Sequence, residues 1–329
     1  MSSNSIRHLI SISELTTPEF KSLVSQAAHH KKQIKNGIHQ YQFAQSPQPL
    51  AGQTVTLLFT KRSTRTRISS EGAAAYFAGT PMFLGKEDIQ LGVNESLLDS
   101  AKVISSMTSC IFARVDSHQV IQDLCRYSSV PVINSLCDTY HPLQAICDLL
   151  TIKEAFAKEG GDEALKGLKL AWIGDANNVI NDLAIAALKF GINVSIATPE
   201  GINMSPKILA AAEKVSAETG AQLSLTHDPK EAASNANVLV TDTFVSMGEE
   251  AQTKAKLQRF KGFCVDESLG AVAAPNWKFM HCLPRHEFEV SDGVFYDDKR
   301  SLVFGEAENR LYAAIAVIEA FVVNKGKFI

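Results

Sequence analysis

The chain has 329 residues, of which 45% are hydrophobic and 20% are charged, and its formal net charge is -3. This composition is ordinary for a globular enzyme, and the length fits about two domains. The negative balance argues against a nucleic-acid surface, and no uninterrupted apolar run is long enough for a membrane-spanning helix.

Six cysteines are spread along the chain without a Cys-x-x-Cys pair, which favours reduced thiols over a disulfide framework. Residues 1–20 contain one arginine, Arg7, and two glutamates, Glu14 and Glu19. This pattern is typical of neither a secretory signal nor an arginine-rich transit peptide. We therefore expect a cytoplasmic protein; the mitochondrial matrix is the alternative if a presequence precedes this chain.

The most unusual stretch is Lys61–Arg67, which places four cations and three hydroxyl groups in seven residues. The apolar run 54–59 before it predicts a buried strand, and the alanine-rich run 68–78 after it predicts a helix. Between a strand's carboxyl end and a helix's amino end, unpaired N–H groups and the helix dipole favour an anion. We predict a site for phosphate or an acyl phosphate; the alternative is a solvated charge run.

Strand and helix patterns alternate through the chain, which predicts an α/β fold with mostly parallel sheets. Ligands of such sheets lie beyond the carboxyl ends of strands, so Arg114, at the end of a strand over 110–115, can join the anion site. The alternative for Arg114 is a surface salt bridge. Other elements expected in the first half are strands at 82–84 and 130–134 and helices at about 17–34, 97–106, 117–126 and 145–156.

A histidine and a glutamine, His141 and Gln144, lie just before the helix expected at 145–156. His141 is either a loop histidine satisfied by backbone groups or a site residue. Cys137 and Cys147 lie nearby, but neither their spacing nor a fourth partner matches a zinc site, and we expect no metal.

The second half begins with a strand–helix–strand unit, with strands at 168–173 and 193–197 and a helix at 179–190. Its turn lacks the G-x-G-x-x-G pattern, so we predict no dinucleotide site. Two asparagines, Asn177 and Asn178, either make the turn and cap the helix or reach a ligand.

Two later strands lead into polar segments. A strand at 238–241 ends in Asp242, before a glycine-containing loop and a helix expected at about 249–260. A carboxylate there suits an ammonium group; the alternative is a capping aspartate. A strand at 278–280 leads to the sequence His-Cys-Leu-Pro-Arg at 281–285, in which neighbouring histidine and cysteine side chains point to opposite faces, unlike a thiol-protease dyad.

The C-terminal pattern predicts a strand at 301–304 and a helix at 307–323. Arg310 would stand near the start of that helix, where an anion is favoured.

Four motifs together resemble the ornithine carbamoyltransferases, within the aspartate/ornithine carbamoyltransferase superfamily. They are Ser-Thr-Arg-Thr-Arg at 63–67, His-Pro-Leu-Gln at 141–144, Asp-Thr-Phe-Val-Ser-Met-Gly at 242–248 and His-Cys-Leu-Pro-Arg at 281–285. The resemblance extends from about residue 6 to 323, with the motifs in the family's order. It implies transfer of a carbamoyl group from carbamoyl phosphate to the side-chain amine of L-ornithine, giving citrulline and phosphate, without a metal or organic cofactor.

The resemblance also implies a role for each motif. The phosphate would be bound by Ser63, Thr64, Arg65, Thr66 and Arg114. The carbamoyl group would be held by His141, Gln144, Arg310 and the backbone carbonyls of Cys282 and Leu283, and the Leu283–Pro284 bond would be cis. Ornithine would be positioned by Asn178, Asp242, Ser246 and Met247, with Cys282 beside its reacting amine.

At the scale of the whole chain, the resemblance implies two domains, each a mostly parallel sheet flanked by helices, with the active site in the interdomain cleft. Residues 1–150 would bind carbamoyl phosphate and residues 151–329 would bind ornithine, with the helix 307–323 able to pack back on the first domain. Family members form homotrimers whose sites borrow a residue from a neighbouring chain, here Gln90. The alternatives are a carbamoyltransferase for putrescine or aspartate, and a non-catalytic phosphate-binding homologue.

Overall fold

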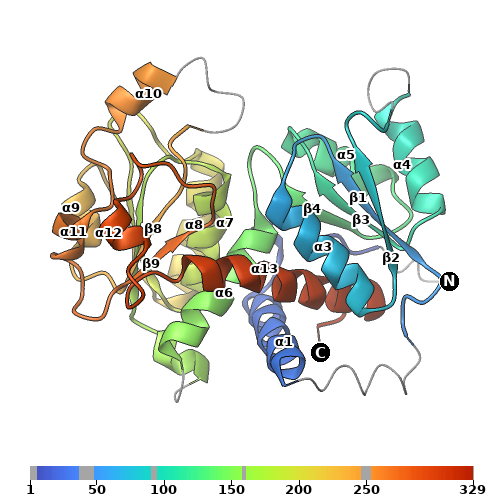
Figure 1. The fold of residues 1–329 in the computed structure, drawn as a ribbon, viewed down its shortest axis with the longest axis horizontal. Helices are drawn as coiled ribbons and strands as arrows, with labels where there is room; N and C mark the ends of the chain where they lie inside the picture. Colours follow the sequence, from blue (N-terminus) through green and yellow to red (C-terminus); the bar gives the residue numbers. More distant parts are fainter. Residues whose placement is uncertain (1–5, 37–47, 90–94, 158–160, 246–252, 329) are drawn as a thin grey trace. The chain divides into compact units, whose positions relative to one another are not determined.

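The computed structural model describes residues 6–36, 48–89, 95–157, 161–245 and 253–328 (Figure 1). Its contacts divide the chain into two compact units. Unit 1 comprises residues 1–150 and 309–329, and unit 2 comprises residues 151–308.

Unit 1 contains a four-stranded parallel sheet in the order β2-β1-β3-β4. Its strands are β1 (Thr54–Phe59), β2 (Thr80–Gly85), β3 (Cys110–Arg114) and β4 (Val132–Leu136). Helices in the N-terminal part of unit 1 include α1 (Thr17–Lys35), α3 (Thr64–Tyr76), α4 (Leu97–Ser106), α5 (His118–Tyr127) and α6 (Pro142–Phe156), and the short 3-10 helix η1 (Ile12–Glu14) precedes α1. Because β1 lies between β2 and β3, the strand order reverses beside it, and this is where parallel sheets bind ligands.

Unit 2 contains a five-stranded parallel sheet in the order β7-β6-β5-β8-β9. Its strands are β5 (Lys169–Ile173), β6 (Asn193–Ala197), β7 (Leu223–Thr226), β8 (Val238–Thr241) and β9 (Lys278–His281). The helices are η2 (Gly161–Leu165), α7 (Asn178–Lys189), α8 (Pro206–Thr219), α9 (Pro229–Ala233), α10 (Thr253–Arg259), α11 (Glu267–Gly270) and α12 (Asp292–Phe295). Here the order reverses between β5 and β8, which brings the carboxyl ends of these two strands together. The predicted α/β fold with two mostly parallel sheets is thus confirmed.

Several helices begin where a polar side chain replaces a missing backbone partner. The Ser63 hydroxyl accepts a hydrogen bond from the Thr66 N–H, and Ser96 does the same for Asp99 at the start of α4. Such caps are each worth about 1 kcal/mol.

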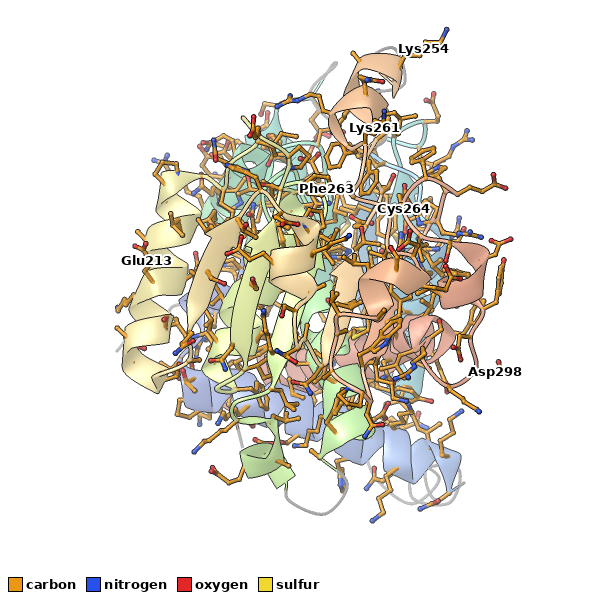
Figure 2. The ribbon with its side chains drawn as sticks, turned by 90° about the vertical axis from the view of Figure 1, so that its left-hand side faces the viewer. Glu213, Lys254, Lys261, Phe263, Cys264 and Asp298 are labelled. Carbon is orange, nitrogen blue, oxygen red and sulfur yellow. The ribbon has the colours of Figure 1, made fainter. Side chains whose placement is uncertain are left out.

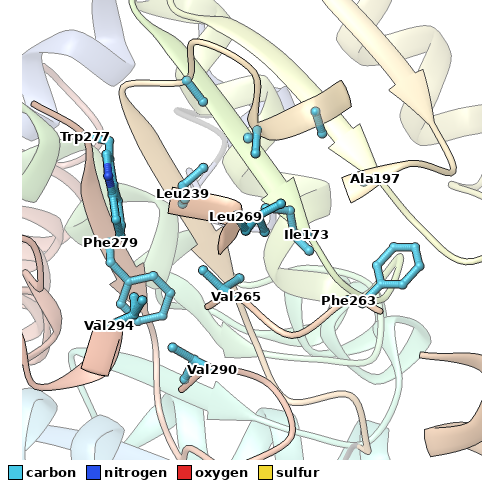
Figure 3. Packing of buried hydrophobic residues seen from close by; sticks show 14 of the residues in the cluster. Ile173, Ala197, Leu239, Phe263, Val265, Leu269, Trp277, Phe279, Val290 and Val294 are labelled. Carbon is cyan, nitrogen blue, oxygen red and sulfur yellow. The ribbon is translucent and has the colours of Figure 1, made fainter. Parts of the chain in front are cut away.

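The core of unit 2 is a continuous apolar cluster against one face of its sheet. Figure 3 shows Ile173 of β5 and Leu239 of β8 close to Leu269 of α11 and Val265, with Phe279 of β9 beside Trp277. Each of these side chains is buried. The packed side chains hold β5, β8 and β9 in one rigid sheet, so the loops that leave their carboxyl ends start from fixed positions.

The strand predicted at 301–304 was wrong, whereas the helix predicted at 307–323 is confirmed with an earlier start. Ser301 makes only an isolated bridge to Phe279, and the chain turns directly into helix α13 (Val303–Val317), which continues as the π-helix η4 (Ile318–Val323). A short apolar run cannot distinguish a strand from a buried helix by periodicity alone. As a result Arg310 lies about two turns into α13 rather than near its start.

Among the described residues, no helix has both the length and the apolar character that a membrane crossing requires.

Candidate active site

The anion-binding stretch of unit 1 follows β1 and begins α3. Ser63 is extended, with φ -164° and ψ 123°, and its hydroxyl oxygen lies 3.3 Å from the Thr66 nitrogen that donates to it. The first turn of α3 contains no acidic side chain. The positive end of the helix dipole is therefore not offset within its own first turn, which suits binding of an external anion.

The four cations of this stretch have different surroundings. Lys61 lies 3.4 Å from Asp116, and Arg67 lies 2.9 Å from Glu71, one helical turn later. The Arg67 guanidinium also stacks over Phe83, 3.9 Å from the ring centre. Lys61 and Arg67 thus pair with nearby carboxylates. Arg65 is close enough to His141 to act on it electrostatically.

Arg310 connects three helices at the candidate site. One guanidinium nitrogen, Nη1, donates to Gln144 Oε1 of α6 at 2.6 Å, and the other, Nη2, donates to Thr66 Oγ1 of α3 at 3.1 Å. His141 Nε2 lies 3.3 Å from the same Nη1. All four side chains are buried, between 1% and 4% exposed. The structure therefore brings these four predicted residues together through direct contacts.

His141 lies in a positive environment. Burial lowers the pKa of its imidazole well below the usual value, and the charges of Arg310, Arg114 and Arg65 lower it further. His141 is therefore neutral at neutral pH. Because a guanidinium can only donate, the 3.3 Å contact with Arg310 makes Nε2 the acceptor and places the imidazole proton on Nδ1.

Arg114 lies at the carboxyl end of β3, opposite Phe59 of β1 in the sheet. The β3–β4 register shifts between Ala113 and Arg114, an irregularity of the kind that redirects a side chain. The Arg114 side chain is buried, which excludes the surface salt bridge considered as its alternative.

In unit 2, a carboxylate, an amide and a thiol meet at the carboxyl ends of β5, β8 and β9. The Asn177 amide donates to Asp242 Oδ2 at 2.8 Å, and the Cys282 thiol donates to Asp242 Oδ1 at 3.1 Å. Asn177 also caps α7, because its side-chain oxygen accepts from the N–H groups of Val179 and Ile180. Asp242 is 6% exposed, and burial raises the pKa of its carboxyl group.

Glu289 is a central residue that the sequence analysis missed. Its carboxylate accepts from His281 Nε2 at 3.1 Å, from the His286 backbone at 2.9 Å and side chain at 2.8 Å, and from the Phe244 N–H at 3.3 Å. These hydrogen bonds, led by that of His281, lower the pKa of Glu289 despite its burial. The carboxylate joins the segment after β8 to the segment after β9, and a glutamate between Phe288 and Val290 was the available signal.

The segment after β9 adopts the backbone that the family resemblance implied. The Leu283–Pro284 bond is cis, and Leu283 has a positive φ of 62°. The Leu283 N–H donates to His281 Nδ1 at 2.9 Å, so His281 carries its proton on Nε2, facing Glu289.

The remaining predicted site residues fall into two groups. Thr64 and Asn178 are the first residues of α3 and α7, and neither side chain is buried. The other predicted residues, Gln90, Ser246 and Met247, lie outside the described residues.

A hollow of about 580 Å³ beside α10 does not coincide with these groups. It is lined mainly by apolar side chains, including Phe244, Leu257, Phe260 and Phe288, with the exposed Lys254 and Lys261 on its border. Figure 2 labels both lysines together with Cys264 on this part of unit 2. Burial raises the pKa of the Cys264 thiol, which makes it a poor nucleophile, so we assign no chemistry to this hollow. Within the described part of the chain, no cluster of three or more histidine, cysteine or acidic side chains is arranged to hold a metal.

The sequence matches the two domains of aspartate/ornithine carbamoyltransferase. Residues 7–154 match the carbamoyl-P binding domain, and residues 166–321 match the Asp/Orn binding domain. The chain belongs to the aspartate/ornithine carbamoyltransferase family.

Two similar relatives are the mitochondrial ornithine transcarbamylase of Pachysolen tannophilus and the ornithine carbamoyltransferase of Saccharomyces cerevisiae. The first is 62% identical over 98% of this chain and 91% of the relative, and the second is 61% identical over 99% of this chain and 96% of the relative. The crystal structure of a mitochondrial ornithine carbamoyltransferase from Coccidioides immitis matches with a TM-score of 0.88 at 52% identity, covering 99% of this chain and all of that one. The structure of the Pyrococcus furiosus ornithine carbamoyltransferase matches with a TM-score of 0.89 at 38% identity, covering 98% and 99%.

Proposed function

We propose that the chain transfers the carbamoyl group of carbamoyl phosphate to the side-chain amine of L-ornithine, giving L-citrulline and phosphate. The observation that carries this proposal is the Arg310 cluster, in which one buried polar residue from each of α3, α6 and α13 converges with the buried His141 beside the positive end of α3. Such a cluster can hold an anion together with an adjacent carbonyl group. The relatives named ornithine carbamoyltransferase support the choice of reaction.

In the proposed reaction, Ser63, Thr64, Arg65 and Thr66 bind the phosphate at the amino end of α3. Arg114 and Thr66 stabilise the oxyanion that develops on the carbonyl when the amine attacks. Arg310 and Gln144 hold the carbamoyl group. The buried neutral His141 can donate only through its protonated nitrogen, so its contribution to the oxyanion requires a change of tautomer or of its contact with Arg310.

The acceptor amine is assigned to the polar groups of unit 2. An alkylamine has a pKa of about 10.4, so it arrives mostly as an ammonium ion. Asp242 binds that ammonium ion, and the Cys282 thiol beside it lies next to the reacting nitrogen. Asn178, Ser246 and Met247 are assigned to the rest of ornithine. The proton that the amine must lose goes to the departing phosphate, or to Cys282 after its thiol has given its own proton to Asp242.

The experiment that tests the proposal is a colorimetric citrulline assay of the purified chain, with L-ornithine, putrescine and L-aspartate compared as acceptors by product formation. We expect ornithine to be used best. In the same assay Arg65→Ala should lower turnover by about 100-fold or more, as expected for loss of a group that stabilises developing charge.

Arg67→Ala is the matched control, because Arg67 lies on the same helix but pairs with Glu71 and Phe83. It should retain most of the turnover. Near-normal turnover in Arg65→Ala, or a preference for another amine, would contradict the assignment.

We also propose that the chain forms a homotrimer to which Gln90 of each copy contributes. Large apolar side chains are exposed at Ile68 of α3 and Met82 of the edge strand β2, with 65% and 48% of their surface accessible. Exposed apolar groups beside a strand edge are suited to contact another subunit. Sedimentation equilibrium measures the mass directly, and a monomer at micromolar concentration would refute this.

For the compartment, we propose the cytoplasm, with the mitochondrial matrix as the alternative. The names of the relatives from Pachysolen tannophilus and Coccidioides immitis favour that alternative. Fractionation of the source cells, followed by immunodetection of the chain, distinguishes the two.

A further inference from the structure

We propose that Asp148 is a positioning residue that fixes the amide of Gln144 and thereby makes the site prefer a carbamoyl group over an isosteric acetyl group. This inference rests on the proposed function, which it deepens by naming a residue that sets substrate selectivity. Asp148 lies one helical turn after Gln144 in α6, and it belongs to none of the motifs described above.

The geometry leaves the Gln144 amide one orientation. Its Nε2 lies 2.7 Å from Asp148 Oδ1, and its Oε1 lies 2.6 Å from Arg310 Nη1. An amide nitrogen can only donate, so Asp148 must be the acceptor whatever its protonation state; a guanidinium can only donate, so Oε1 must accept from Arg310. The two neighbours therefore demand the same orientation from opposite ends of the amide.

This orientation has a chemical consequence. The Gln144 oxygen faces the cluster of Arg310, His141 and Thr66, which are assigned to the substrate's carbonyl and phosphate. A carbonyl oxygen has two lone pairs, and Arg310 occupies one of them. The other suits an N–H donor, which the amide end of a carbamoyl group supplies and a methyl group does not. A site built to hydrogen-bond a substrate N–H rejects analogues that lack it.

The burial of Asp148 shows that this contact is not incidental. Asp148 and Gln144 are each 2% exposed, so water is not available to replace a lost partner. Without the Asp148 acceptor, Arg310 alone opposes reversal of the amide, so the reversed state becomes more populated; in that state the NH₂ end faces both the Arg310 guanidinium and the N–H of the substrate. The reversed amide therefore opposes binding of a carbamoyl group more than binding of an analogue that lacks the N–H.

The test uses two stable phosphonates that differ in one group: phosphonoacetamide carries the NH₂ of a carbamoyl group, and acetonylphosphonate carries a methyl group in its place. Each is measured as an inhibitor competing with carbamoyl phosphate. The quantity of interest is the ratio of the inhibition constant of acetonylphosphonate to that of phosphonoacetamide. A purely structural role for Asp148 would change stability or both constants together, but not their ratio.

In Asp148→Leu we expect the ratio to fall about tenfold, the loss of roughly one hydrogen bond, while acetonylphosphonate binds within about twofold of wild type. Asp148→Asn keeps a possible acceptor and should give an intermediate ratio. Because Asn has the same size and shape as Asp, it carries the test by itself if the Leu variant does not fold. In a Gln144→Leu background, Asp148→Asn should cause no further fall, because the amide through which Asp148 acts is gone.

The outcomes separate the two claims. A wild-type chain that neither forms citrulline nor prefers phosphonoacetamide would overturn both the proposed function and this inference. A wild-type chain with both properties, combined with an unchanged ratio in the folded Asp148 variants, would overturn the inference alone.

Discussion

Two buried ionisable side chains, one in each unit, have pKa values shifted in the direction that favours their neutral forms. Burial and three arginines lower the pKa of His141, and burial raises the pKa of Asp242. A neutral imidazole leaves the positive charge to the arginines, which are suited to phosphate. A buried carboxylate that is costly to ionise gains from an incoming ammonium ion, which stabilises its charged form.

This gain leads to a prediction for Asp242→Asn. The variant should raise the KM for ornithine by about 10- to 100-fold, since a charge-assisted hydrogen bond is lost. The KM for carbamoyl phosphate should change little. The measurement is steady-state kinetics with each substrate varied in turn, and an unchanged response to ornithine would refute the role of Asp242.

The same variant should be more stable than wild type at neutral pH. Burial raises the pKa of Asp242 in the folded chain, so the folded chain binds the proton of this carboxyl group more tightly than the unfolded chain does. The unfolding free energy therefore falls as the pH rises from the unfolded-state pKa to the folded-state pKa of Asp242. The cost is complete above the folded pKa and absent below the unfolded value of about 3.9. The Asp242→Asn substitution should therefore raise the Tm at pH 7 and lose this advantage on acidification, whereas Asp298→Asn, on the exposed surface of unit 2 (Figure 2), should not change the Tm.

At the scale of elements, the site is built where strands end and helices are capped. Asn177 illustrates this, because the structure satisfies both interpretations that its sequence left open. Its oxygen caps α7, and its NH₂ group donates to Asp242. One side chain thus contributes both to the stability of a helix and to the orientation of a site carboxylate.

Two substitutions separate these contributions. Asn177→Ser keeps a capping oxygen and removes the donor to Asp242, whereas Asn177→Ala removes both. We expect the Ala variant to lose about 1 kcal/mol of unfolding free energy and the Ser variant to lose much less. Both should weaken ornithine binding to a similar degree. Denaturant unfolding and ornithine titration measure the two effects, and equal stability losses would contradict the capping role.

Most elements were predictable because their signals are local. Strand 238–241 and helix 97–106 have the predicted bounds, since apolar runs and a capping serine define them. The start of α13 was not predictable, because Leu302 and Val303 fit a strand as well as a buried helix. The central role of Glu289 depends on contacts between segments up to 45 residues apart, which no local pattern reveals.

The site was predictable to a similar extent. The motifs identified Thr66, His141 and Gln144, and the resemblance added Arg310, but their mutual contacts join residues as much as 244 positions apart. The resemblance singled out Arg65 among the four cations of 61–67, but the sequence did not reveal the partners of the others. Only the structure shows that Lys61 and Arg67 pair with nearby carboxylates.

At the scale of the molecule, the two units have separate sheets, and two helices contribute residues to both. The boundaries after Leu150 and Glu308 fall within α6 and α13. Both tryptophans of the chain, Trp172 and Trp277, belong to unit 2. Tryptophan fluorescence therefore reports unfolding of unit 2, whereas far-UV circular dichroism reports both units.

This difference allows a test with Gly270→Ala. A Cβ at Gly270 would lie 2.4 Å from Cζ2 of Trp277, a buried indole that is packed in the core, so the two groups cannot keep their positions. Overpacking of this kind costs about 1–3 kcal/mol. Gly305→Ala is the control, since a Cβ there meets nothing within 4 Å and alanine favours the helix by about 0.5–1 kcal/mol.

At fixed protein concentration, we expect Gly270→Ala to lower the midpoint of thermal unfolding measured by tryptophan fluorescence. The part of the circular dichroism transition that belongs to unit 1 should be less affected. Inorganic phosphate, whose site is assigned to α3, should stabilise unit 1 by mass action and raise the midpoint of its circular dichroism transition. At 100 times its Kd, phosphate should add about 2.7 kcal/mol to the unfolding free energy of unit 1. If fluorescence and circular dichroism instead shift together in every variant and with phosphate, the continuous helices α6 and α13 couple the units into one cooperative structure. That result would refute independent stability of the units while leaving the assignment of the site unchanged.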